Sequence, residues 1–168
     1  PAFALVIAAN RDEFHARAAA PAAWGAAPPF HRILAGRDLQ AGGTWLGVRR
    51  DGRWALVTNV REGGRQDPAA RSRGELVPEV LNADAAGADP LQAVAVAGPR
   101  YNGFNLLAGD AANAHWISNR GSGPARLARG LHGLSNALLD TPWPKLERTS
   151  AQVRAWIARA ETGTDALF

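Results

Sequence analysis

Leu5-Val6-Ile7-Ala8-Ala9-Asn10-Arg11-Asp12-Glu13-Phe14 is the stretch around which the chain is organised, and it changes abruptly from apolar to polar. Its first five residues are apolar and lack Gly and Pro, which predicts a buried β-strand. Polar side chains at the end of a buried strand reach the rim of a sheet, where sites are commonly built. On an extended chain Asn10 and Asp12 share one face, while Arg11 and Glu13 share the other. The ordinary alternative is a strand that ends in a surface salt bridge.

The length and composition of the chain limit what it can be. Its 168 residues predict one domain with a sizeable core. The sequence has no apolar run of membrane-spanning length and no signal-peptide pattern, so we expect a cytoplasmic protein without a membrane span. Without cysteine, these residues form neither disulfides nor thiolate metal sites. The histidines lack the spacing of metal ligands, so we expect no metal and no cofactor.

The basic residues do not form a nucleic-acid-binding pattern. The net charge is +4, and the only lysine among the 19 basic residues is Lys145. The arginines are scattered among acidic residues, and their densest group is Arg71-Ser72-Arg73. A phosphate-binding surface usually needs a basic stripe with interleaved aromatic residues. We therefore expect a small-molecule substrate or ligand as partner and no nucleic acid, and the sequence leaves the oligomeric state open.

Both ends of the sequence lack the features of a natural terminus. The chain begins with Pro1, contains no methionine, and stops at Phe168 without a terminating element. We therefore expect a fragment that is open at both ends.

Two β-hairpins are the clearest local predictions. Residues 44–49 and 53–60 are rich in β-forming residues, and Asp51-Gly52 between them is a strong turn signal. Residues 104–109 and 114–119 form a second such pair, with the turn over residues 110–113.

The segments around these hairpins are predicted from their turn formers. Residues 16–29 contain several prolines and no helical period, which predicts a loop. The apolar pair Ile33-Leu34 precedes a predicted polar turn over residues 36–38. Residues 131–136 are predicted to form a short strand that ends in Asn136.

Three helices are predicted. Ser72 and Glu75 have the spacing of a capping box, and Pro78 predicts either a kink or a late start of the helix that follows. A second helix is expected over residues 90–97, with proline in its first turn. The last is expected from the Thr141-Pro142-Trp143-Pro144 start to about residue 160. Its predicted buried side consists of Val153, Trp156, Ile157 and Ala160. Together these elements predict an α+β fold of two hairpin-rich sheets with helices packed outside.

Asparagine recurs at the predicted strand ends. Asn10, Asn59 and Asn136 each follow a strand, and Asn102 and Asn119 flank the second hairpin. Each one alone is most simply a turn former. Together they could form a ring of neutral donors that stabilises an oxyanion. The Arg11-Asp12 pair could orient or activate a nucleophile, although the chain has no cysteine and no Gly-x-Ser-x-Gly motif to supply one.

Asn10-Arg11-Asp12-Glu13 resembles the signature of the NRDE family, which is similar to the transport and Golgi organisation protein 2 of animals. Further segments resemble the same family, in the same order, over nearly the whole chain. They are Ala35-Gly36-Arg37-Asp38, Gly42-Gly43-Thr44-Trp45-Leu46-Gly47, Leu56-Val57-Thr58-Asn59-Val60-Arg61, Ser72-Arg73-Gly74-Glu75-Leu76, Tyr101-Asn102-Gly103-Phe104-Asn105-Leu106, Gly133-Leu134-Ser135-Asn136-Ala137 and Leu139-Asp140-Thr141-Pro142-Trp143-Pro144-Lys145.

The resemblance implies a four-layer αββα sandwich of the N-terminal-nucleophile (Ntn) hydrolase type, incomplete at both ends. Family members open with Met-Cys, and a cysteine exposed by removal of the Met would be the nucleophile. Asn10, Arg11 and Asp12 would then lie beside it, with Asp12 touching its amine. Asn59 would be the oxyanion-hole asparagine, and Asn136 would orient the substrate. The cysteine strand is absent here, so the resemblance implies that this fragment is inactive.

Further candidate substrate-binding residues complete the expected site: Glu13, Trp45, Asn102, Asn105 and Asn119. The resemblance favours a hydrolase for a small amide or acyl substrate. The alternative is a non-catalytic binding or trafficking protein for haem or for lipid or acyl-CoA on the same fold.

Haem would need an axial ligand, for which the candidates are His15 and His31, close in sequence to Trp24 and Phe30. Trp24 and Trp143 would line an acyl pocket or, alternatively, staple loops to the core.

Overall fold

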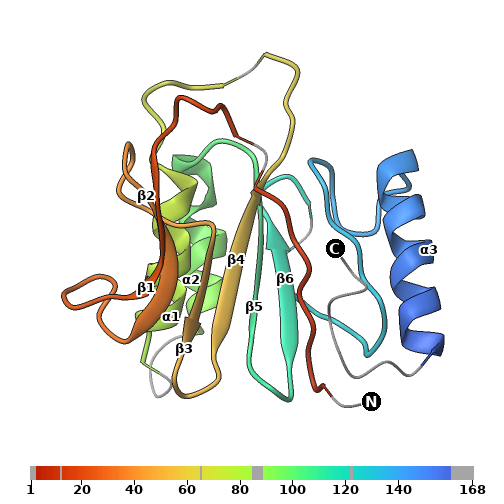
Figure 1. The fold of residues 1–168 in the computed structure, drawn as a ribbon. Coiled ribbons are helices and arrows are strands. Elements are labelled where there is room, and N and C mark those ends of the chain that lie inside the picture. The colour runs from red at the N-terminus through yellow and green to blue at the C-terminus, as the bar shows by residue number, and fades with distance from the viewer. Residues whose placement is uncertain (1–2, 12, 65, 85–88, 122, 160–168) are drawn as a thin grey trace.

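The computed structural model describes residues 3–11, 13–64, 66–84, 89–121 and 123–159. Within them the chain has an α+β fold around a seven-stranded antiparallel sheet, whose strand order follows the chain from β1 to β7 (Figure 1). The strands are β1 (Ala19–Trp24), β2 (Ile33–Asp38), β3 (Leu46–Arg49), β4 (Trp54–Asn59), β5 (Phe104–Gly109), β6 (Ala114–Ser118) and β7 (Ala125–Arg126). The α-helices are α1 (Leu76–Asn82), α2 (Pro90–Ala97) and α3 (Pro144–Ala158). Two short 3-10 helices cover Arg73–Glu75 and Gly98–Arg100.

Both predicted hairpins are confirmed. The β3–β4 turn contains Gly52 with a φ of 86°, a conformation that glycine adopts without steric cost. In the β5–β6 turn, the carboxylate of Asp110 accepts hydrogen bonds from the backbone N–H groups of Ala112 and Asn113. The pairing of β4 with β5 runs over six residues and joins the two hairpins into one sheet.

One face of the sheet forms the main core. Because side chains alternate along a strand, Ala55, Leu106 and Ile117 point to this face, and all three are buried. Val77 and Leu81 of α1 are buried in the same hydrophobic cluster. Burying each large aliphatic side chain contributes roughly 1.5–3 kcal/mol. Figure 1 shows α1 and α2 together on this side of the sheet.

The opposite face is covered by the segment over residues 131–140, which leads into α3. Thr58 Oγ1 donates to the backbone carbonyl of Ser135 at 3.3 Å, and Asn105 Nδ2 donates to that of Ala137 at 2.8 Å. A methyl group on Gly133 would lie 2.7 Å from Leu146 Cδ1, so α3 packs closely on this segment. In Figure 1 α3 lies on the side of the sheet away from α1 and α2.

The first two helices have the predicted positions, but one cap differs. The α2 prediction is confirmed, and the Asp89 carboxylate accepts from Leu91 N at 2.9 Å. Helix α1 begins late, at Leu76, so that Pro78 lies in its first turn, where no hydrogen-bond donor is needed. The capping-box prediction is wrong: the Ser72 side chain makes no cap hydrogen bond, and the Glu75 carboxylate pairs with the Arg71 guanidinium instead of with the Ser72 backbone.

Helix α3 is confirmed, with a narrower buried side than predicted. Trp156 is buried and Val153 is half-buried, whereas the side chain of Ile157 is 54% exposed. Ile157 is therefore a wrong core prediction, since α3 contacts the molecule along one narrow stripe. Ala160 lies outside the described residues.

The apolar run over residues 5–9 is not the predicted buried strand. It is extended but outside the sheet, and Leu5 and Val6 are 42% and 40% exposed. An apolar run becomes a buried strand only where another strand pairs with its backbone. The described part of the chain pairs no strand with this run.

Three further segments differ from the predictions. Strand β1 lies within the predicted loop over residues 16–29, and Pro21 is accommodated because β1 is an edge strand with an irregular register. Strand β2 continues through the predicted turn at residues 36–38. Residues 131–136 form no strand. Their polar contacts go to single groups, such as the Thr58 hydroxyl, and not to the backbone of a second strand. The described residues thus form one sheet rather than the two expected.

Candidate functional site

A pocket of about 540 Å³ lies where the chain leaves β4 and meets the segment before α3. This volume is in the range of small-molecule binding sites, although the depression is widely open to solvent rather than enclosed. The pocket is lined by Val60, Arg61, Gly63, Arg120, Asn136, Ala137, Leu138, Thr141 and Trp143.

Two of the predicted site asparagines are joined by a hydrogen bond, and one of them, Asn136, lines this pocket. Asn136 Nδ2 donates to the backbone carbonyl of Asn59 at 3.1 Å, and Arg61 N donates back to the carbonyl of Asn136 at 2.8 Å. The side chain of Asn59 is exposed, and its amide has no hydrogen-bond partner among the residues that the structure describes. Asn59 itself does not line the pocket, and the alternation along β4 places its side chain on the same face of the strand as Ala55.

Asn105 supports the pocket from behind. It is fully buried, accepts from Trp116 Nε1 at 3.1 Å and donates to the carbonyl of Ala137 at 2.8 Å. Because Ala137 lines the pocket, Asn105 ties the pocket wall to the sheet. Its amide is engaged by the protein on both sides, which is a structural role.

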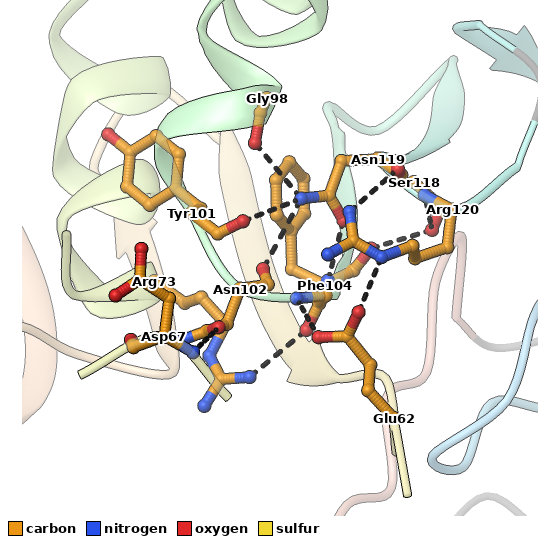
Figure 2. A network of polar contacts seen from close by, with 11 residues as sticks. Glu62, Asp67, Arg73, Gly98, Tyr101, Asn102, Phe104, Ser118, Asn119 and Arg120 are labelled. Atoms are coloured by element: carbon orange, nitrogen blue, oxygen red, sulfur yellow. Dashed lines mark hydrogen bonds and ion pairs between the residues drawn. The ribbon is translucent and has the colours of Figure 1, made fainter. Parts of the chain in front are cut away.

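Asn102 and Asn119 belong to a separate polar network, shown in Figure 2. Asn119 accepts from Phe104 N at 2.8 Å and donates to the carbonyls of Gly98, Tyr101 and Asn102 at 3.0–3.3 Å. Asn102 exchanges two hydrogen bonds with the backbone of Asp67. Neither asparagine lines the pocket.

Glu62 links that network to the pocket (Figure 2). Its carboxylate accepts from Gly103 N and from Arg120 Nε, both at 2.6 Å. The backbone hydrogen bond and then the arginine lower the pKa of Glu62. Glu62 therefore holds Arg120 against the pocket rim as an ionised partner.

Arg73 supports the same network, and its side chain is more buried than that of Arg120. It donates to the carbonyl of Gly103 at 3.0 Å (Figure 2). Burial is the main cause that lowers the pKa of Arg73, and nearby Glu62 acts in the opposite direction.

The described residues of the Asn10-Arg11-Asp12-Glu13 signature do not line the pocket. Asn10 is exposed, and the Arg11 guanidinium lies 4.8 Å from the centre of the Trp45 ring. This distance is typical of a cation–π contact. Glu13 Oε2 is 3.5 Å from Arg17 Nη1. Asp12 lies outside the described residues.

The candidate histidines and tryptophans separate into two groups. His15 and His31 are exposed, and neither lines the pocket. Trp143 lines it, whereas Trp24 lies elsewhere, with the Arg50 guanidinium 4.0 Å from its ring centre. Within the described ranges, no group of three His, Cys, Asp or Glu residues could hold a metal ion. No helix in the described part of the chain is long and apolar enough to cross a membrane.

The sequence-based candidates missed several residues of the site. Arg61, Glu62 and Arg120 were not among them, although Arg61 and Glu62 directly follow the strand that ends in Asn59. That position was an available signal. Arg120 carried no such signal, because only the fold brings the end of β6 to the end of β4.

Comparisons with known proteins agree on one family. The model of the family described as Transport and Golgi organisation 2 matches residues 1–168. Similar curated proteins include the Transport and Golgi organization 2 homolog of Mus musculus and the Transport and Golgi organization protein 2 homologs of Bos taurus and Homo sapiens. Each is 43% identical over 155 residues, which cover 86% of this chain and 55% of the relative. This chain thus spans about half the length of these relatives, and it belongs to the Transport and Golgi organisation 2 family.

Proposed function

We propose that the whole protein is an Ntn-type cysteine hydrolase for a small amide or acyl substrate, with its nucleophile outside this chain. The observation that carries the proposal is the hydrogen bond by which Asn136, which lines the pocket, holds the backbone carbonyl of Asn59. The side-chain amide of Asn59, which has no hydrogen-bond partner among the described residues, is a neutral donor of the kind that stabilises a developing oxyanion.

Each asparagine has a distinct role in this proposal. The Asn59 side chain donates to the oxyanion that forms when the nucleophile attacks the substrate carbonyl. Asn136 orients this corner, because its amide already holds the Asn59 backbone carbonyl. Fixed donors of this kind need no reorganisation at the moment of reaction.

The full αββα sandwich is part of the same proposal. Phe3, Leu5 and Val6 are each 40–42% exposed on an extended segment that has no strand partner among the described residues. We expect a second sheet, formed with chain outside this sequence, to cover this segment. The Arg11–Trp45 contact would then stand near the nucleophile, and Asp12 would contact its amine.

The proposal is tested first at the N-terminus of the intact natural protein. We expect mass spectrometry to find a cysteine exposed by removal of methionine. Asn59→Ala should then lower amide hydrolysis by roughly 10²–10³-fold. Asn113→Ala, in the turn at the opposite end of the β5–β6 hairpin, is the matched control and should leave the rate unchanged. An N-terminal residue without a thiol or hydroxyl would rule out this mechanism.

A second candidate is ligand binding without catalysis, for haem or for lipid or acyl-CoA. It is favoured by the apolar part of the pocket lining, namely Val60, Ala137, Leu138 and Trp143. A carrier would keep its function when the N-terminal cysteine is replaced by serine and would lose it when Ala137→Phe fills the pocket. The hydrolase would show a large loss of turnover with the first variant.

A further inference from the structure

Arg61 is a free cation on the pocket lining. It follows β4, is exposed, and its backbone N–H is held by the carbonyl of Asn136 at 2.8 Å. Its guanidinium makes no hydrogen bond and no ion pair with any residue that the structure describes. The backbone is thus anchored while the charged group remains available to a ligand.

The other charges around the pocket do not neutralise Arg61. Arg120 also lines the pocket, but its charge is matched by Glu62 at 2.6 Å. None of the described lining residues is Asp or Glu. Among the described residues, one positive charge therefore remains uncompensated at the pocket.

The rest of the lining sets the character of a matching ligand. Leu138 and Trp143 are both half-buried and present apolar surface, and Asn136 adds a neutral polar group. An aromatic or aliphatic body would therefore fit the pocket wall, with one negative group near Arg61. The planar guanidinium offers two parallel donors, which match the two oxygens of a carboxylate.

From this arrangement we infer that the pocket binds a monoanionic carboxylate with an apolar body, and that the Arg61 guanidinium pairs with its carboxylate. The inference deepens the proposed hydrolase function on which it rests, because it names the class of substrate. That class is an amide or acyl compound in which one half carries a free carboxylate. Leu138 and Trp143 would contact the apolar part.

The test is a binding measurement on the full-length natural protein, which requires no turnover. Phenylacetate, phenethylamine and 2-phenylethanol share one apolar body and differ in charge. We expect phenylacetate to shift the backbone amide NMR signals of Arg61, Asn136 and Ala137 with saturation, and the other two probes to bind at least about tenfold more weakly.

Variants of Arg61 separate charge from geometry. Arg61→Gln should weaken phenylacetate binding about tenfold or more, and Arg61→Lys should weaken it less, because a point charge remains without the two-donor fork. Arg50→Gln removes the same charge at the opposite end of the β3–β4 hairpin and should change nothing. The native NMR spectrum of each variant shows that it is folded.

Three results would overturn the inference: equal binding of phenylacetate and phenethylamine, equal effects of Arg61→Gln and Arg50→Gln, or no binding of phenylacetate. If the protein hydrolyses uncharged amides while phenylacetate does not bind, the inference fails and the hydrolase proposal stands. If phenylacetate binds through Arg61 but the protein has no N-terminal nucleophile, the hydrolase proposal fails and the carboxylate site stands.

Discussion

The side-chain amide of Asn136 donates a hydrogen bond of 3.1 Å to the backbone carbonyl of Asn59, which lies 77 residues earlier in the chain. This bond closes one corner of the pocket and connects the end of β4 to the segment before α3. The segment has no strand of its own, so its position depends on a few such contacts.

Asn136→Ala should therefore affect ligand binding more than folding. The lost bond is exposed, so we expect the free energy of unfolding to fall by about 1 kcal/mol or less. Asn82→Ala is a matched control, because Asn82 Nδ2 also makes one exposed bond to a backbone carbonyl, that of Pro29. Urea denaturation should give similar losses for both variants, whereas ligand binding should weaken only for Asn136→Ala. Equal binding by the two variants would contradict a role for Asn136 at the pocket.

Asn105→Ala should be far more destabilising. It removes the one side chain that satisfies two groups, so that Trp116 Nε1 and the carbonyl of Ala137 lose their hydrogen bonds. Leaving buried polar groups unsatisfied costs about 1–3 kcal/mol each, so we expect a loss of about 3 kcal/mol in urea denaturation. Asn113→Ala, in the β5–β6 turn, loses one hydrogen bond from Arg126 that is exposed to solvent and should change stability by less than about 1 kcal/mol. A small effect of Asn105→Ala would show that the segment over residues 131–140 is not held by this residue.

Gly43 is required by a close backbone approach. A methyl group there would lie 2.6 Å from the carbonyl carbon of Gly74, next to the hydrogen bond from Thr44 N to Gly74 O. Because both sides of the contact are backbone, Gly43→Ala should lower the free energy of unfolding by about 1–3 kcal/mol. At Gly123 an added methyl meets nothing within 4 Å, so Gly123→Ala should stay within about 0.5 kcal/mol of the parent. Thermal denaturation of the two variants checks this difference.

His132 makes the same segment sensitive to pH. Its Nδ1 lies 2.8 Å from Asp140 Oδ2 and its Nε2 lies 2.9 Å from the carbonyl of Ala128. Both partners are acceptors, so only the protonated ring donates to both. The hydrogen bond to Asp140 and then that to Ala128 raise the pKa of His132.

Because the pKa of His132 is raised in the folded state, the stabilisation that its protonated ring provides is complete at low pH. It should be fully present below the unfolded pKa of about 6.5 and be lost as the pH rises through the higher folded pKa. We expect the difference in unfolding free energy between the parent and His132→Gln to shrink over that range. His115→Gln serves as the control, and a difference independent of pH would contradict the role of His132.

Local signals in the sequence determined the hairpins and the helices. The Asp51-Gly52 turn between two β-rich runs and Pro90 in the first turn of α2 each act within a few residues of the chain. Their outcome depends on backbone conformations that one or two residues prefer, so they could be predicted without a tertiary structure.

Pairing between distant segments was decided only by the tertiary structure. Strand β1 forms despite Pro21 because β2 pairs with it, while the run over residues 5–9 stays outside the sheet because no described strand does. A strand's backbone hydrogen bonds are made to another segment, so its own residues cannot specify whether the partner is present.

The same distinction applies to the candidate site. The sequence by itself determined that asparagines follow the strands, and that these residues include no cysteine. Only the fold decided that the amides of Asn105 and Asn119 are consumed by internal hydrogen bonds, whereas that of Asn59 has no partner among the described residues. An asparagine has the same donors and acceptors wherever it stands, and its use depends on which carbonyl and N–H groups the packing brings within reach.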